Sequence, residues 1–259
     1  MNGSTPRAES GRAPRVLGLL LATLSLASCA TIRELHVDEL EDPWAEVGAG
    51  DLSLGVGSGW AFYSAEVEAE GTGGALFGET GTDRPTLMPR YGGAVKLGRY
   101  FTDDVALGLV VEHRNFEADP VMPLDAELVA QPFSTNHFLV TGRWFLQPTG
   151  PSRRIRPFLG LDLGYVPEVD FGPVDVNYPD DVPSDRITIV GSDYWTLAPV
   201  VGASYMLQPG LSLDVGAFYE FAITPGEDTL VLPGLGGATV DVEVWAEGLI
   251  LFFGVNWIL

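Results

Sequence analysis

From residue 52 to the C-terminus, large apolar residues alternate with small or polar ones, and this period of two predicts β-strands with two different faces. The first such segment has Leu52, Leu54, Val56, Trp60 and Phe62 on one face, and the residues between them are mostly Gly, Ala and Ser. The large residues of seven further segments are Tyr91, Val95, Leu97 and Phe101; Val105, Leu107, Leu109 and Val111; Phe138, Val140, Trp144 and Leu146; Leu159, Leu161, Leu163 and Tyr165; Trp195, Leu197, Val201, Ala203, Tyr205 and Leu207; Leu211, Leu213, Val215, Tyr219 and Phe221; and Leu249, Leu251, Phe253, Val255, Trp257 and Leu259. The pattern therefore predicts eight strands.

The connections between these segments alternate in length. Short ones lie at 102–104, from residue 147 onward, and at 208–210, whereas long ones run over about 70–89, 117–132, 167–193 and 222–247. An even number of antiparallel strands with short turns at one end and long loops at the other is typical of bacterial outer-membrane barrels. The sequence thus predicts an all-β fold, an eight-stranded antiparallel up-and-down transmembrane β-barrel over residues 51–259, with both ends of that region on the periplasmic side.

A soluble eight-stranded barrel of the lipocalin type is the alternative, because it also alternates apolar and polar residues. Its outer face would carry many charged residues, whereas the second face here is largely Gly, Ala, Ser and Thr, which suit a tight lumen. Aromatic residues also gather near both strand ends, as in the two interfacial girdles of membrane barrels. Lipid is therefore the expected solvent of the larger side chains.

The N-terminal residues have the parts of a secretory signal peptide. Arg7, Arg12 and Arg15 precede an apolar run over 16–26, which is too short to remain as a membrane-spanning helix. The only cysteine follows in the sequence Leu26-Ala27-Ser28-Cys29, which resembles the lipobox of bacterial lipoproteins. The resemblance implies a lipoprotein signal peptide over 1–28 and covalent acyl chains on Cys29. Ordinary cleavage nearby, with Cys29 a bystander, is the alternative. Residues 29–50 are acidic, lack apolar periodicity and end in Gly48 and Gly50, so they are predicted to form a periplasmic acidic tether.

Several segments resemble the strand-turn-strand units of small bacterial outer-membrane β-barrel proteins, the group that includes outer-membrane proteins A, W and X. Examples are GGAVKLGRYFTDDVALGLVVEHRNF, RPFLGLDLGYVPE and LSLDVGAFYEF. The resemblance covers residues 51–259 and is one of pattern. It implies a location in the bacterial outer membrane, with outer-membrane lipid as the partner of the barrel wall.

Composition limits the other partners. The chain has 35 Asp and Glu against 14 Lys and Arg, a net charge of -21, so phosphate backbones would be repelled and nucleic acid is not expected. The acidic residues are frequent in the long loops over 117–132 and 167–185. These loops can bind an extracellular partner or divalent cations, although such charge more often only solvates a surface.

Charged residues of both signs fall on the predicted lumen face. They are Lys96, Glu112, Arg114, Arg143, Asp162, Asp214 and Glu220. Because charges inside a closed barrel need partners, we expect an ion-pair network centred on Lys96, Glu112, Arg143 and Asp162. The alternative is that these side chains reach toward water at the ends of the barrel.

Catalytic chemistry has little support in the sequence. The histidines are His36, His113 and His137, and no nucleophile-elbow, metalloprotease or phosphate-loop motif occurs. Ser134 and His137 resemble the serine and histidine of barrel-shaped lipid A deacylases, but their opposite parity places them on opposite faces of a strand. We therefore expect no enzymatic activity, no cofactor and no metal site.

Two functions remain open. The first is a non-enzymatic structural or surface-interaction role that displays acidic loops outside the cell. The alternative is a narrow channel for small or hydrophobic solutes, which the resemblance to the outer-membrane protein W type implies. Because eight strands enclose a lumen that side chains can fill, a large permanent pore is not expected.

Overall fold

The computed structural model describes residues 43–124, 126–150, 153–178 and 182–259, without the side chains of 89–91. The predicted signal peptide, the lipidation site Cys29 and most of the predicted tether lie outside these residues. Nearly all the described residues are in antiparallel strands, apart from the short 3₁₀ turns η1 (Gly74–Leu76) and η2 (Pro233–Leu235). None of their helices has the length and apolar character needed to cross a bilayer.

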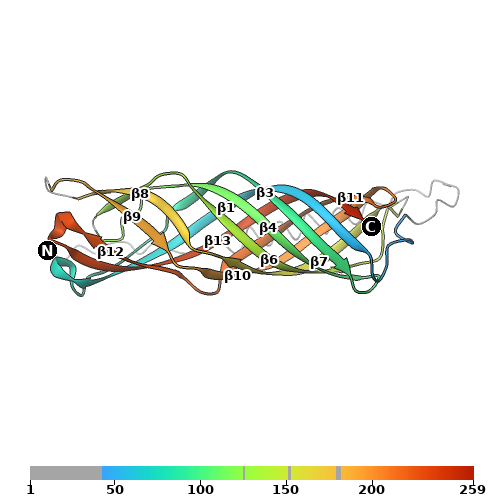
Figure 1. The fold of residues 1–259 in the computed structure, drawn as a ribbon, viewed down its shortest axis with the longest axis horizontal. Coiled ribbons are helices and arrows are strands. Elements are labelled where there is room, and N and C mark those ends of the chain that lie inside the picture. The colour runs from blue at the N-terminus through green and yellow to red at the C-terminus, as the bar shows by residue number, and fades with distance from the viewer. Residues whose placement is uncertain (1–42, 125, 151–152, 179–181) are drawn as a thin grey trace, which may run out of the picture. The chain divides into compact units, whose positions relative to one another are not determined.

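Eight strands close the barrel wall in the order β1-β13-β11-β10-β7-β6-β4-β3, and β3 pairs back to β1. Figure 1 shows these strands tilted around a common axis. Their bounds are β1 Leu52–Gly73, β3 Thr86–Tyr100, β4 Val105–Ala118, β6 Phe133–Phe145, β7 Ile155–Val166, β10 Tyr194–Gln208, β11 Leu211–Ala222 and β13 Ala238–Ile258. The predicted fold class is confirmed.

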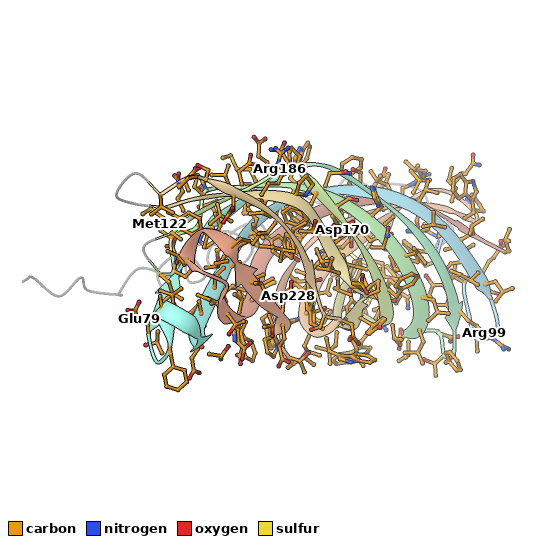
Figure 2. The ribbon with its side chains drawn as sticks, turned by 60° about the vertical axis from the view of Figure 1, so that its left-hand side comes forward. Glu79, Arg99, Met122, Asp170, Arg186 and Asp228 are labelled. Carbon is orange, nitrogen blue, oxygen red and sulfur yellow. The ribbon has the colours of Figure 1, made fainter. Side chains whose placement is uncertain are left out.

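Short turns join β3 to β4, β6 to β7 and β10 to β11 at one end of the barrel, which we call the turn end. The tightest of them is Pro209-Gly210, where Gly210 adopts a φ of 75°, a conformation that glycine accepts without steric cost. The C-terminus lies at the same end, because Leu259 exchanges backbone hydrogen bonds with Leu52 at 2.8 and 3.1 Å. In Figure 2, Arg99 marks this end, and Glu79 and Met122 mark the opposite, loop end.

The two faces of the wall strands differ as predicted. On β1 the exposed apolar side chains run from Leu52 to Phe62, and Trp60 and Phe62 are 65% and 63% exposed. This stretch has the length of about 9–11 residues that a tilted strand needs to cross the hydrocarbon core. The opposite face packs inside the barrel, where the small residues of β1 leave room for bulky side chains of other strands. A continuous band of exposed apolar side chains therefore surrounds the wall.

The long connections differ from the expected loops, because more than half of their residues lie in strands, either in extensions of the wall strands or in further strands. The added strands are β2 Thr80–Asp83, β5 Glu127–Ala130, β8 Val169–Asn177, β9 Asp185–Gly191 and β12 Gly226–Leu232. β2 and β12 pair with the ends of β1 and β13, while β5, β8 and β9 form a separate sheet. Buried residues such as Val67, Leu230 and Val240 give this loop-end extension a hydrophobic core of its own.

Candidate functional site

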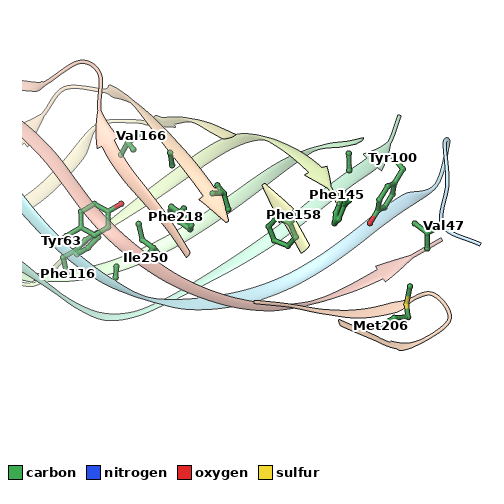
Figure 3. Close-up of a cluster of buried hydrophobic side chains, with 14 of the residues drawn as sticks. Val47, Tyr63, Tyr100, Phe116, Phe145, Phe158, Val166, Met206, Phe218 and Ile250 are labelled. Atoms are coloured by element: carbon green, nitrogen blue, oxygen red, sulfur yellow. The ribbon is translucent and has the colours of Figure 1, made fainter. Parts of the chain in front are cut away.

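The interior of the barrel contains a column of buried aromatic and aliphatic side chains. Figure 3 shows Tyr63 and Phe116 toward one end, Phe218 and Phe158 farther along, and Tyr100 near the other. Neighbouring rings lie in contact, with centroids of Tyr63 and Phe116 5.5 Å apart and those of Tyr100 and Phe145 also 5.5 Å apart. The lumen is therefore largely filled, although cavities remain at two levels.

The larger cavity lies where the wall passes into the loop-end extension, and we call it the chamber. The space between its walls is about 1060 Å³, counting the part that is open to solvent. Its walls are almost entirely apolar, with side chains from both the barrel and the extension. They include Ala65, Val67, Leu87, Phe116, Ala118, Leu128, Phe133, Val169, Phe171, Val174, Ile189, Leu230, Val242, Val244 and Ala246.

A buried ion cluster lies below the chamber. Both terminal guanidinium nitrogens of Arg114 donate to the carboxylate of Glu220, Nη1 at 2.9 Å and Nη2 at 3.1 Å, and Nη2 also donates to Glu112 at 2.7 Å. The Tyr63 hydroxyl donates to Glu220 and accepts from Arg114. The closed barrel brings together residues that are up to 157 positions apart in the sequence, as Tyr63 and Glu220 are. The cluster closes the lumen under the chamber because its members occupy the centre of the barrel and bind one another across it.

His137 and Thr135 connect this cluster to the chamber. Both side chains are buried and both line the chamber. Thr135 Oγ1 lies 2.9 Å from His137 Nε2, and His137 Nδ1 lies 3.6 Å from Glu220 Oε1, which is too long for a hydrogen bond. With Tyr63 and Tyr194, which line the same cavity, they form what we call the polar floor of the chamber.

Two further ion pairs lie closer to the turn end. Arg143 makes a bidentate pair with Asp162, whose second bond is 2.9 Å long. Lys96 Nζ lies 3.7 Å from Asp214, whose other oxygen accepts a hydrogen bond of 2.6 Å from Ser204. All seven predicted lumen residues thus lie on inward faces, but the partner of Glu112 is Arg114. A second cavity, of about 680 Å³, lies beside Lys96, Arg143, Asp162 and Asp214.

The turn end is covered by residues that precede β1. Trp44 is only 4% exposed, and its indole nitrogen donates to the Arg154 carbonyl at 3.1 Å. The Arg156 guanidinium lies over the Trp44 ring, 5.6 Å from its centroid, and donates to Asp104 at 2.8 Å. Val47 joins the same hydrophobic cluster. The end of the predicted tether therefore packs as a cap within the barrel.

One part of the wall is not joined by a backbone ladder. β1 and β3 pair at Gly57–Ala94 and next at Tyr63–Leu87, and within the described residues no backbone pair joins 58–62 to 88–93. Each strand stays paired with its other neighbour there. The Ser58 hydroxyl, which donates to the Gly92 carbonyl at 2.6 Å, crosses the gap. We call this region the seam, and it runs between the levels of the chamber and the second cavity.

The structure does not bring together the serine and histidine that were considered as a catalytic pair. Ser134 is exposed and His137 is buried, so the two side chains lie on opposite faces of β6. Among the described residues, no group of three or more His, Cys, Asp or Glu is arranged to hold a metal ion.

The exterior of the extension is acidic, with Glu68 opposite Glu243 and Glu70 opposite Asp241 on neighbouring strands. Glu227 of β12 lies opposite Glu243 on its other side. In the same region, burial and the hydrogen bond from its hydroxyl to Asp185 raise the pKa of Tyr178 to about 12. These acidic residues lie outside the two predicted acidic loops, 117–132 and 167–185, and belong to β1, β12 and β13.

The chamber was not predicted from the sequence. Its signal is the alternation of apolar residues beyond the predicted wall strands, as in Val67 and Ala69 or Val240, Val242 and Val244. Thr135 and Tyr63 also escaped notice as site residues, because nothing in the local sequence shows that they meet Arg114 and Glu220.

The closed antiparallel wall and its apolar exterior define a membrane-spanning β-barrel of the small outer-membrane type. No protein-family model matches the chain, and no curated protein matches it. Among solved structures, outer membrane protein OprG from Pseudomonas aeruginosa is similar with a TM-score of 0.56 and 16% identity, over 81% of this chain and 97% of that one. Outer membrane protein AlkL, solved in lipid bilayers, is similar with a TM-score of 0.53 and 13% identity, over 88% and 97%. At these identities the likeness shows the fold alone.

Proposed function

We propose that this chain is a non-enzymatic barrel of the bacterial outer membrane that binds small apolar molecules in the chamber, with the loop end outside the cell. The observation that carries the proposal is the chamber itself. Small-molecule sites are typically concave and lined by apolar side chains with a few placed polar groups, and an apolar guest that enters such a site removes apolar surface from water. A purely structural barrel would gain nothing from keeping it empty, so the chamber favours the solute-binding alternative.

The lower lumen supports binding rather than open conduction. The Arg114–Glu220 cluster lies under the chamber, and Trp44 covers the turn end. For a solute that leaves the chamber toward the membrane, the seam between β1 and β3 is the proposed route, because no backbone ladder joins these strands there and Tyr63 and Leu87 at its edge line the chamber. Planar-bilayer recordings should accordingly show no steady ion conductance.

Filling the chamber tests the proposal. Ala65 and Ala246 face each other across β1 and β13 and both line the chamber. Changing each to Phe should abolish the binding of an environment-sensitive naphthylamine dye to the full chain in nanodiscs, because the added rings occupy the cavity. Ala203→Phe on the outer face of β10 is the matched control and should bind as the wild type does. Unchanged dye binding in the Ala65→Phe, Ala246→Phe variant contradicts the proposal.

A further inference from the structure

The chamber is apolar on its walls but not at its floor, and this asymmetry defines the molecule that fits it. Of the residues that line it, the polar ones near the ion cluster are Tyr63, Thr135, His137 and Tyr194. A pure hydrocarbon would leave these groups facing an apolar surface, which costs free energy when a buried polar group can make a further hydrogen bond.

Two hydroxyls of the floor have bonding capacity left. A hydroxyl offers one donor and two lone pairs, and Thr135 uses one of these positions toward His137 Nε2. The Tyr194 hydroxyl makes no hydrogen bond within the described residues, and its ring packs against the buried hydrophobic cluster. The Tyr63 hydroxyl, in contrast, is already bound to both Glu220 and Arg114. The floor can therefore exchange hydrogen bonds with one small polar group.

The charge below the floor sets the charge of that group. Arg114 contributes one positive charge and is bound by two carboxylates, those of Glu112 and Glu220. A carboxylate head group would bring a third negative charge beside them into a site with little water, where like charges repel strongly. A neutral hydroxyl adds no charge and can both donate and accept.

On these grounds, and resting on the proposed function of the chamber, we infer that its preferred ligand is a neutral amphiphile. Such a molecule has an apolar chain or ring that fills the chamber and one hydroxyl that bonds the Thr135 and Tyr194 side chains at the floor. Medium-chain alcohols have this chemistry. Alkanes lack the head group, and the corresponding carboxylates carry the wrong charge.

Octane, octanol and octanoate, titrated into the full chain in nanodiscs, test the inference. The chain has three histidines, so the isotope-labelled ring of His137 reports on the floor, and the exposed His113 ring serves as an internal reference. Octanol should bind about fivefold more tightly than octane, the effect of one net hydrogen bond, and should shift the His137 ring signals. Octanoate should bind more weakly than octanol.

Thr135→Val should lower the affinity for octanol toward that for octane, and Thr135→Ser, which keeps the hydroxyl, should retain the preference. Thr141→Val is the matched control, because Thr141 is also buried on the lumen face of β6 but does not line the chamber. Native gel mobility shows whether each variant folds. Equal binding of octane and octanol, or tightest binding of octanoate, overturns the inference while the proposed function stands. If none of the three binds, the proposed function fails and the inference fails with it.

Discussion

At the scale of single residues, sequence parity placed the lumen charges on the correct face but could not pair them. The expected network had Lys96, Glu112, Arg143 and Asp162 at its centre, whereas the structure has Arg114 bound by Glu112 and Glu220 and separate pairs elsewhere. Pairing depends on strand register and barrel stagger, which bring Arg114 and Glu220 together across 106 positions. A period of two gives the face of a residue and says nothing about the level at which it meets another strand.

Removal of one positive charge from the lumen should destabilise the barrel by different amounts at the levels of Arg114 and Lys96. Arg114→Met leaves the buried Glu112 and Glu220 without their partner and should destabilise the barrel by about 3–5 kcal/mol. Lys96→Met should cost less, because the Lys96 side chain is 24% exposed, its nitrogen lies 3.7 Å from Asp214, and Asp214 keeps its serine partners. Urea unfolding followed by heat-modified gel mobility measures both. Restoring stability to Arg114→Met by adding Glu220→Gln supports the explanation, and equal losses in the two single variants contradict it.

At the scale of elements, the eight wall strands were predictable because each carries its own alternation of large and small residues. The strands of the extension were not, because their outward residues are acidic and their sequences lie between Gly and Pro residues typical of loops. Glu66, Glu68 and Glu70 continue the strand that Leu52 begins, and the inward Val67 and Ala69 keep the same period. Where β1 passes from lipid into water, its outward residues change from apolar to acidic, although the strand continues without a break.

If the seam between β1 and β3 is the route from the chamber into the membrane, a covalent link across it should block that route. With Cys29 changed to Ser, the pair Ser58→Cys and Gly93→Cys should form a disulfide across the seam, since these positions come next in register after the Gly57–Ala94 pair and a Cβ on Gly93 would lie 3.9 Å from the Gly57 carbonyl oxygen. Dye delivery from solution into proteoliposome lipid should then fall to the rate of protein-free liposomes and recover on reduction. A cross-link between Val201→Cys and Ala217→Cys, which pair in a closed part of the wall, should leave delivery unchanged. Undiminished delivery through the oxidised seam excludes this route.

At the scale of the whole molecule, one physical distinction orders the fold: the outer face of the wall presents large apolar side chains to lipid, while the inner face combines small and charged residues with a column of buried aromatic ones. This inverts the arrangement of a soluble barrel and accounts for both the glycine-rich inner face of β1 and the exposed Leu, Val and Trp side chains. The chamber appears where the wall rises above the apolar band, because there the inward faces become apolar and the outward faces acidic. The predicted lipid anchor at Cys29 stays a prediction.

The tryptophans test this arrangement directly. Trp60, Trp144, Trp195 and Trp257 are 42–65% exposed on the outer face, near the two ends of the apolar band, whereas Trp44 is 4% exposed inside the turn end. In lipids whose acyl chains carry bromine, single-tryptophan variants that keep one of the four should be quenched, most strongly by bromine near the headgroups. The variant that keeps only Trp44 should stay bright, because the barrel wall separates its ring from the acyl chains. Quenching of Trp44 to the same extent, or bright fluorescence from the outer four, would mean that the wall does not face lipid.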